Sequence, residues 1–357
     1  MRKITKNTGS AVMGIDLGRK RSQIAVVESG EVVDEFAVTM NRDAVRKAFE
    51  DRPRCEVVME ACGGSPWVSR LLDEMGFRSV VVASDSLKRA FHHRQKTDRS
   101  DARALAQLRA SGLPLLRPVS HRPEVAQRDL AIFRIRDSFV HQRTQLINAV
   151  RGILASLGVS LPKCSTPSFA KRASDALNDE DRALVGPALR QITALSHEIR
   201  QLDAKIQKRA AESYPAVQLV TQVSGVGVLT GLAFVLTVTD PARFPKSRSI
   251  GAYLGLVSRL EQSGDSNPQL SITKAGDAFC RRLMVQAAHY ILGPFGPDTD
   301  LRRIGLAIAD RGGKNAKKRA AVAVARRLSV LLLSLWKTGE VYEPLRNTQQ
   351  RAKAKSA

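Results

Sequence analysis

Short apolar runs separated by turn signals dominate the start of the chain. Within residues 11–37, AVMGIDLG ends in Asp and Gly, SQIAVVES follows a basic turn, and EVVDEFAV follows Gly30. Runs of this length between turn residues are typical of strands joined as an antiparallel meander. Beyond them the pattern predicts a helix near 43–50, a strand at 55–60, a helix at 67–75, a strand at 78–83 and a further helix.

Three strands followed by alternating helices and strands indicate a mixed α/β sheet. The order is that of an RNase H-like fold, which we predict for residues 1–115. The signal comes from the order of the elements, and no single run would suffice for it.

The hydrophobic period changes to that of helices in the middle of the chain. Residues 124–157 can form one long amphipathic helix, and Ile192, Leu195, Ile199, Leu202 and Ile206 recur three and four residues apart. That spacing is typical of a coiled-coil seam, either within one chain or between two copies. We predict a helical coiled-coil linker over 116–213, in which residues 158–181 form a loop rich in Gly, Pro, Ser and Asn.

A compact, mainly α-helical domain is predicted for residues 214–340. It opens with TQVSGVGVLTGLAFVLTV, in which Gly225 and Gly227 separate two apolar segments. This arrangement is similar to a helix-hairpin-helix, whose backbone N–H groups can meet a phosphate, but a plain turn between helices has the same pattern. Residues 341–357 are polar and basic, and we predict a disordered tail there.

The charge of the chain narrows the class of partner. Lys and Arg number 57 against 34 Asp and Glu, a formal charge of +23, of which +12 falls in residues 216–357. Such an excess indicates a polyanion, either nucleic acid or an anionic membrane surface. Nucleic acid is favoured because no strongly amphipathic terminal helix is visible. Aromatic residues make up only 5%, so contacts to phosphate are expected to dominate over base stacking.

Composition also excludes several classes. A hydrophobic content of 43% argues against global disorder. Apolar stretches such as 328–336 are too short to span a bilayer, and no apolar run precedes Ala11, so we expect no secretory signal. Four cysteines without metal-binding spacing are expected to be ordinary thiols of a cytoplasmic protein.

Four carboxylates carry the candidate chemistry. Asp16 ends the first strand in GIDLG, Glu60 ends a later strand in VVMEACGG, and Asp98 and Asp101 lie one helical turn apart in KTDRSDARALAQL. Taken singly, each has another explanation as a turn, helix-cap or helix-dipole residue. Taken together, they would repel one another unless they bound divalent cations such as Mg²⁺, which can support phosphodiester chemistry.

GIDLG also occurs in actin-like sugar kinases and ATPases, which begin with a similar meander. Those proteins need a second α/β domain with phosphate and adenosine loops. Residues 120–357 are predicted to be helical and offer none. We therefore rank that alternative low.

The motifs GIDLG, MEACGG and KTDRSDARALAQL, in this order, resemble those of the insertion-sequence 110 family of DEDD transposases, which includes the Piv-like DNA invertases. The second half agrees, because SGVGVLTGLAFVLTV, FPKSRSIGAYLGLVSRLEQSGDS and ITKAGDAFCRRLMVQAAH are similar to the C-terminal transposase domain of the same family. The resemblance covers about residues 12–110 and 215–295 strongly.

The resemblance implies a RuvC-like domain paired with a helical domain that carries a serine nucleophile. It implies Mg²⁺, with Mn²⁺ possible, bound by Asp16, Glu60, Asp98 and Asp101. It further implies double-stranded target and donor DNA as substrates and a structured bridge RNA that pairs with both. Members act as tetramers with active sites assembled across subunits, so a homo-oligomer, either dimer or tetramer, is expected.

The family's serine lies between its GLV and ITK motifs, a segment that reads SRLEQSGDSNPQLS here. Ser263 is the first candidate, with Ser266 and Ser258 as alternatives. Unaided, a serine hydroxyl is a weak nucleophile, so nearby cations are expected to assist. The residues expected to contact nucleic acid are Arg19, Lys20, Arg134, Arg136, Arg143, Arg151, Lys274, Arg281, Arg282, Lys317, Lys318 and Arg319.

Three other functions are compatible with parts of this pattern. A Piv-like site-specific invertase would share the chemistry but select its sites differently. A junction nuclease similar to RuvC would need the acids but would use water in place of serine. A nucleic-acid-binding scaffold would need neither the acids nor the serine.

Overall fold

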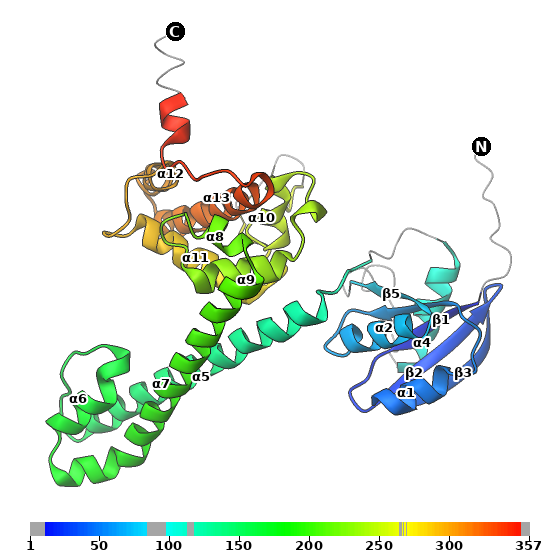
Figure 1. The fold of residues 1–357 in the computed structure, drawn as a ribbon, viewed down its shortest axis with the longest axis horizontal. Coiled ribbons are helices and arrows are strands. Elements are labelled where there is room, and N and C mark those ends of the chain that lie inside the picture. The colour runs from blue at the N-terminus through cyan, green and yellow to red at the C-terminus, as the bar shows by residue number, and fades with distance from the viewer. Residues whose placement is uncertain are drawn as a thin grey trace. The chain divides into compact units, whose positions relative to one another are not determined.

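The computed structural model describes residues 11–83, 98–112, 118–263, 266, 268 and 270–350. The chain divides into two compact units, Met1–Arg122 and Pro123–Ala357 (Figure 1). Across the described ranges no helix combines the length and the apolar character that a bilayer span requires.

A five-stranded mixed sheet forms the first unit. β1 (Val12–Asp16), β2 (Arg21–Glu28) and β3 (Glu31–Thr39) are antiparallel, whereas β4 (Glu56–Glu60) and β5 (Arg78–Val82) run parallel to β1. The strand order is β3-β2-β1-β4-β5. This is the RNase H/RuvC-like arrangement, which confirms the fold class predicted from the order of the elements.

Helices cover both faces of this sheet. α1 (Arg42–Phe49) and α2 (Ser65–Glu74) pack on the face that carries Met13, Ile15, Val57 and Met59. α4 (Asp98–Ala110) packs on the other face, where its Leu105 joins Val12, Val58 and Val82. Successive side chains of a strand point to opposite faces, so this assignment fixes the face of every residue in β1 and β4.

The second unit begins with a long helical hairpin, which we call the arm. α5 (Glu124–Ser156) packs antiparallel against α7 (Asp179–Ser213), and the seam Ile192, Leu195, Ile199 and Ile206 is buried. The contact lies within one chain, which is one of the two arrangements predicted for that seam. The segment predicted as a loop instead contains a 3₁₀ turn (Thr166–Ser168) and α6 (Phe169–Ala176). Phe169 and Ala173 give α6 a buried side that the loop-like composition concealed.

A helical domain follows the arm. It consists of α8 (Ala216–Val220), α9 (Val228–Val238), α10 (Ile250–Tyr253), α11 (Ala278–Leu292), α12 (Asp300–Ala309) and α13 (Ala316–Thr338), with short 3₁₀ turns at Pro241–Arg243 and Ser247–Ser249. Their apolar sides share one core around α9 and α13 with the beginning of α5. Gly225, in the turn between α8 and α9, has φ +89°, and a β-carbon there would lie 2.9 Å from the Tyr290 ring.

The segment after α13 differs from the predicted disordered tail. Residues 346–350 are helical, and the Asp300 carboxylate accepts hydrogen bonds from the backbone N–H groups of Asn347 and Thr348. The Thr348 hydroxyl donates to the same carboxylate at 2.5 Å. The first residue of α12 thereby holds residues 341–348 against the domain. Residues 351–357 lie outside the described part of the chain.

Candidate active site

Two of the four predicted acids end adjacent parallel strands. Ile15 of β1 is paired with Met59 of β4, and Asp16 and Glu60 are the next residues of the two strands. Gly14 and Val58 face α4, and the side chains of Asp16 and Glu60 point to the same face because they lie two residues further on. The two carboxyl groups therefore lie at one edge of the sheet and on one side of it.

Gly14 allows α4 to cross β1 at very close range. A β-carbon at Gly14 would lie 2.2 Å from the carbonyl oxygen of Ala102 and 2.6 Å from the amide nitrogen of Ala106. Only a residue without a side chain permits this approach. This contact fixes the position of α4 along β1. On the helix, the contact begins at Ala102, one residue after Asp101; on the strand, it lies at Gly14, two residues before Asp16.

Ion pairs fix the direction of α4 across the sheet. Near its C-terminal end, Arg109 pairs with Glu56, the first residue of β4. Nearer its N-terminal end, Arg99 and Arg103 both bind Glu35 of β3, with nitrogen–oxygen distances of 2.5 Å. Because the end of α4 lies over the start of β4, the first turn of α4 lies toward the ends of β1 and β4. Asp98 and Asp101 are in that first turn.

The two arginines also hold the Glu35 carboxylate ionised. Hydrogen bonds from Arg103 and Arg99 lower the pKa of Glu35 to about 2. The side chain is largely covered, with 12% exposure. This carboxylate is therefore part of the attachment of α4 and is distinct from the four predicted acids.

The four carboxylates suit a hard divalent cation in their chemistry, because Mg²⁺ prefers carboxylate oxygens. Asp16, Glu60 and Asp101 are half-buried, and Asp98 is exposed. Within the described residues, no three His, Cys, Asp or Glu side chains lie close enough together to hold a metal ion. The backbone thus brings the acids to one edge, and the side chains would have to turn inward to share an ion.

Two features of this edge were not predicted from the sequence. Gln23 of β2 is paired with Asp16 and points to the same face, so it lies beside the acids. Ser65, at the start of α2, accepts a hydrogen bond from the Cys62 N–H and donates one to the Cys62 carbonyl, at 3.0 and 2.9 Å. Its oxygen also lies 3.0 Å from His121 Nε2. The alternation of β2 could have indicated Gln23, whereas the contact with His121 spans 56 residues.

The Ser65 contacts fix the loop that follows Glu60 to the segment that leaves the first unit. That segment also donates a hydrogen bond to the sheet, from the Val119 N–H to the Val81 carbonyl near the end of β5. Burial lowers the pKa of His121, and the charges of Arg70 and Arg122 lower it further. At neutral pH the imidazole is therefore neutral and can share one hydrogen bond with the serine hydroxyl.

The predicted nucleophile lies in the second unit, at the tip of a short β-ribbon formed by the isolated bridges Ser258–Ile272 and Ser263–Ser266. The Arg259 N–H donates to the Ser271 carbonyl at 3.0 Å, and the Thr273 N–H donates to the Val257 carbonyl at 2.9 Å. At the tip, Ser263 and Ser266 exchange two backbone hydrogen bonds of 3.2 and 3.0 Å. Both serines are exposed, whereas Ser258 lies at the base of the ribbon.

The base of the ribbon is tightly built. A β-carbon at Gly276 would lie 1.9 Å from the Tyr253 carbonyl oxygen, and one at Gly255 would lie 2.3 Å from the Ala275 carbonyl oxygen. Lys274 has φ +55°, which is uncommon for a residue with a side chain. The GLV and ITK motifs therefore meet backbone to backbone at the base of the ribbon.

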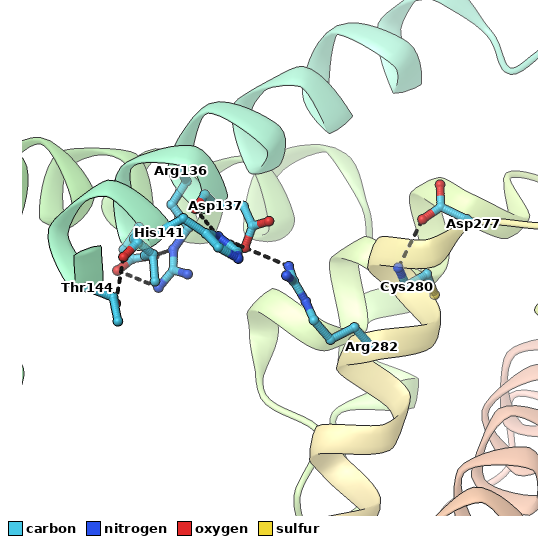
Figure 2. Close-up of polar contacts among 9 residues, drawn as sticks. Arg136, Asp137, His141, Thr144, Asp277, Cys280 and Arg282 are labelled. Atoms are coloured by element: carbon cyan, nitrogen blue, oxygen red, sulfur yellow. Dashed lines mark hydrogen bonds and ion pairs between the residues drawn. The ribbon is translucent and has the colours of Figure 1, made fainter. Parts of the chain in front are cut away.

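Several arginines expected to contact phosphate instead have partners within the domain. Arg282 of α11 binds Asp137 of α5 at 2.6 Å, and Figure 2 shows the two side chains reaching toward each other from their helices. Arg136 binds Asp203 of α7 at 2.7 Å. Arg281 donates to the Leu254 and Ala275 carbonyls at 3.1 and 2.8 Å.

Two further arginines of that set lie in the arm. Arg143 lies between α5 and α7, 3.3 Å from the Ser196 hydroxyl, and burial lowers its pKa. The Arg151 guanidinium lies over the Phe169 ring. These side chains stabilise the arm and its attachment to the helical domain. The candidates that stay exposed are Arg19, Lys20, Arg134, Lys274, Lys317, Lys318 and Arg319.

Comparison with known proteins agrees with the motifs. Residues 13–158 match the DEDD transposase family of IS110 elements, and residues 217–299 match the family described as "Transposase IS116/IS110/IS902 family". The transposase of insertion sequence element IS1111A from Coxiella burnetii is 29% identical over 93% of this chain and 91% of its own length. A probable family 20 transposase from Pseudomonas aeruginosa is 27% identical over 93% and 98%.

Among other similar proteins, the transposase of element IS1328 from Yersinia enterocolitica is 28% identical over 78% of this chain and 82% of its own length. The structure of RuvC from Thermus thermophilus matches 30% of this chain and 99% of its own, with 15% identity and a TM-score of 0.25. Nucleases with this fold and a DEDD acid set generally depend on divalent metal ions. With its RNase H/RuvC-like sheet, its ordered acids and its matching C-terminal domain, this chain belongs to the IS110 family of DEDD transposases and is a DNA transposase.

Proposed function

We propose that this transposase cuts and rejoins DNA with Ser263 as the nucleophile and with Asp16, Glu60, Asp98 and Asp101 as the metal-binding acids. The observation that carries the proposal is that the four acids belong to neighbouring backbone ends, those of β1 and β4 and the first turn of α4. Strand parity places Asp16 and Glu60 on the α4 face, and the ion pairs of α4 bring its first turn to the same edge. Acids with separate structural roles would have no reason to lie at the same edge of the sheet.

The acids would hold Mg²⁺ or Mn²⁺, which would offset negative charge on the phosphate and on the leaving oxygen. Gln23, paired with Asp16, would orient that carboxylate by a hydrogen bond from its amide. The Ser65 hydroxyl would fix the loop that follows Glu60. Each of these chain residues acts through an acid and has no contact with DNA in the proposal.

In the cleavage step, the Ser263 oxygen forms a bond to phosphorus, and its proton passes to solvent. The phosphorus–oxygen bond to the deoxyribose breaks, and the leaving oxygen keeps the electron pair and takes up a proton. The phosphoserine link preserves the energy of the ester, so a strand hydroxyl can later attack it and release Ser263 without ATP. The exposed tip of the ribbon suits this role because a DNA strand can approach it from solvent.

The proposed partners are double-stranded target and donor DNA, a structured bridge RNA that pairs with both, and further copies of this chain in a dimer or tetramer. Exposed Arg19 and Lys20, which follow Asp16, and Lys317, Lys318 and Arg319 of α13 support contacts to phosphate. Guidance by RNA pairing would leave the protein few base edges to recognise, as in other RNA-guided systems.

Junction PCR for the excised circular element, in cells that carry the gene with its native flanks, tests the proposal. Asp101→Ala and Ser263→Ala are each expected to abolish the junction at unchanged protein level. Ser266→Ala is the matched control, because Ser266 is the cross-strand partner of Ser263 and is equally exposed. With purified protein and flanked DNA, a metal chelator is expected to stop cleavage and added Mn²⁺ to restore it.

Other results would change the assignment. Junctions formed by Ser263→Ala but not by Ser266→Ala or Ser258→Ala would move the nucleophile. Cleavage that survives all three substitutions but requires Asp101 would indicate a nuclease that uses water. An inversion product in place of a circle would indicate the Piv-like alternative.

A further inference from the structure

A groove of about 1450 Å³ runs along α13 in the second unit. Its other walls are α12, the base of the Ser263 ribbon and residues 341–347. A site for a small molecule usually measures about 300–1,000 Å³. The size of the groove therefore suits a segment of a polymer better than a metabolite.

The face of α13 that lines the groove alternates between cationic and aliphatic pairs. Lys318 and Arg319 are followed one turn later by Val322 and Ala323, then by Arg326 and Arg327, and then by Val330 and Leu331. This three- and four-residue spacing keeps all four pairs on one side of the helix. The two cationic pairs lie eight residues apart, which is about 12 Å along the helix.

The cations of the groove are available for a ligand. Within the described part of the chain, Arg248, Arg311, Lys318 and Arg327 line the groove, are exposed, and form no ion pair or hydrogen bond. The groove lining includes the acids Asp300 and Glu343, and Asp300, the first residue of α12, is already bound to Asn347 and Thr348. The groove thus presents positive charge above an aliphatic floor that includes Leu256 and Ile272.

We propose that this groove binds an unpaired strand of nucleic acid, with its phosphates at the cationic rim and its bases against the aliphatic floor. The inference rests on the proposed function and specifies one of its substrates. A duplex, with its bases stacked inside, could meet the rim but would leave the floor empty. An unpaired strand can use both, which matches the alternation on α13.

The position of the groove supports a nucleic acid as occupant over an acidic protein segment. Ser258 and residues 270–272 form one wall of the groove, and they are also the base of the ribbon that carries Ser263. Five residues of extended chain, about 17 Å, separate Ser258 from Ser263. A strand held in the groove would therefore pass within about 17 Å of the proposed nucleophile.

Fluorescence anisotropy on the full chain tests this binding mode with a 20-nucleotide single-stranded DNA, an RNA of the same sequence, and the corresponding duplex. Lys318→Gln with Arg327→Gln removes two rim charges. Lys205→Gln with Lys246→Gln is the matched control, because both lysines are exposed and neither lines the groove. Loss of two phosphate contacts should reduce the slope of log K against log salt concentration by about 1.4 in magnitude. At 0.1 M salt this corresponds to a ~25-fold lower affinity for the single strand.

A second variant, Ala323→Trp, fills the floor without changing the charge. It is expected to weaken single-strand binding at least tenfold and to leave duplex binding within twofold. A change with RNA but not with DNA, or the reverse, would identify which strand occupies the groove. Circular dichroism and thermal unfolding would verify that both variants are folded.

Two results would overturn the inference. Equal loss of single-strand and duplex binding in the charge variant, with Ala323→Trp unaffected, would show a basic surface without an occupied groove. A changed oligomeric state of Ala323→Trp in light scattering, with normal nucleic-acid binding, would show a protein interface. The Asp101→Ala variant separates this question from the proposed chemistry, since it should lose the junction but keep single-strand binding.

Discussion

Substitution of Gly14 by Ala tests the construction of the acidic edge without touching an acid. The new methyl group would lie 2.2 Å from the Ala102 carbonyl oxygen and 2.6 Å from the Ala106 amide nitrogen. Both are backbone atoms of α4, so no side-chain rotation relieves the overlap. The helix must move away from β1 until the contact reaches about 3.4 Å, a displacement of about 1 Å.

The displacement acts on stability and on activity to different degrees. Overpacking of this kind typically costs about 1–3 kcal/mol in the free energy of unfolding. The closest contact is with Ala102, which directly follows Asp101, so the displacement reaches the first turn of α4. A misplacement of about 1 Å in an active site can lower the rate by about 100-fold.

The assay is the rate of DNA cleavage by purified Gly14→Ala, together with its urea unfolding curve. Gly152→Ala is the control, because no atom lies within 4 Å of a β-carbon at this helical position. This variant should gain about 0.5–1 kcal/mol in the free energy of unfolding and should cleave DNA at the wild-type rate. If Gly14→Ala also retained the wild-type rate and stability, α4 would not set the positions of Asp98 and Asp101.

Three further predictions concern polar contacts within each of the two units. Glu35→Gln should lower the free energy of unfolding by about 1 kcal/mol at pH 7, because its arginine partners are half-exposed. The pKa of Glu35 is lowered to about 2 in the folded protein. The difference in stability from wild type, measured by urea unfolding, should therefore shrink as the pH falls from 4.5 toward 2. Tyr214→Phe should cost about 1–3 kcal/mol, because the Tyr214 hydroxyl donates at 2.7 Å to Asp129, which is 3% exposed. Burial and that bond raise the pKa of Tyr214 to about 12, so its contribution should be complete below pH 10 and lost between pH 10 and 12, as a spectrophotometric titration with unfolding curves would show. A double-mutant cycle of Arg282→Ala and Asp137→Ala should give a coupling of about 1 kcal/mol in thermal unfolding, and zero coupling would contradict a role for this pair in holding the arm.

Two elements of the architecture separate the tasks of this transposase. The α/β domain holds the acids on a sheet edge that is fixed by backbone pairing and by α4. The ribbon of the helical domain holds Ser263 at an exposed tip above a tightly packed base. In the proposed reaction, this exposed position would let DNA strands reach Ser263, be cut and be exchanged.

The sheet was predictable because each of its strands is a short apolar run between turn residues. The predicted strand at 55–60 begins one residue before β4, and the predicted helix at 43–50 is shifted by one residue at each end relative to α1. Local patterns also indicated the arm, since the recurrence of Ile192, Leu195 and Ile199 is a property of the helix itself. The helix α6 escaped detection because only Phe169 and Ala173 are buried among small and polar residues.

The roles of the arginines could not be predicted from the sequence. Arg282 lies 145 residues from Asp137, and Arg136 lies 67 residues from Asp203. A guanidinium offers the same donors to a phosphate and to a carboxylate, so its residue type does not reveal its partner. Ser65 and His121 meet for the same reason, through the return of the chain past the end of β5.

By itself, the sequence determined the order of the strands and helices, the acids at the ends of two strands, and the excess of positive charge. These are local properties, set by hydrophobic period, turn residues and composition. Only the tertiary structure decided that α4 crosses β1 at Gly14 and brings Asp98 and Asp101 to the edge of Asp16 and Glu60. It also decided which arginines are bound within the domain and which cations of α13 face a groove. The physical reason is that contacts between residues far apart in the chain depend on packing and on paired charges, which local pattern does not encode.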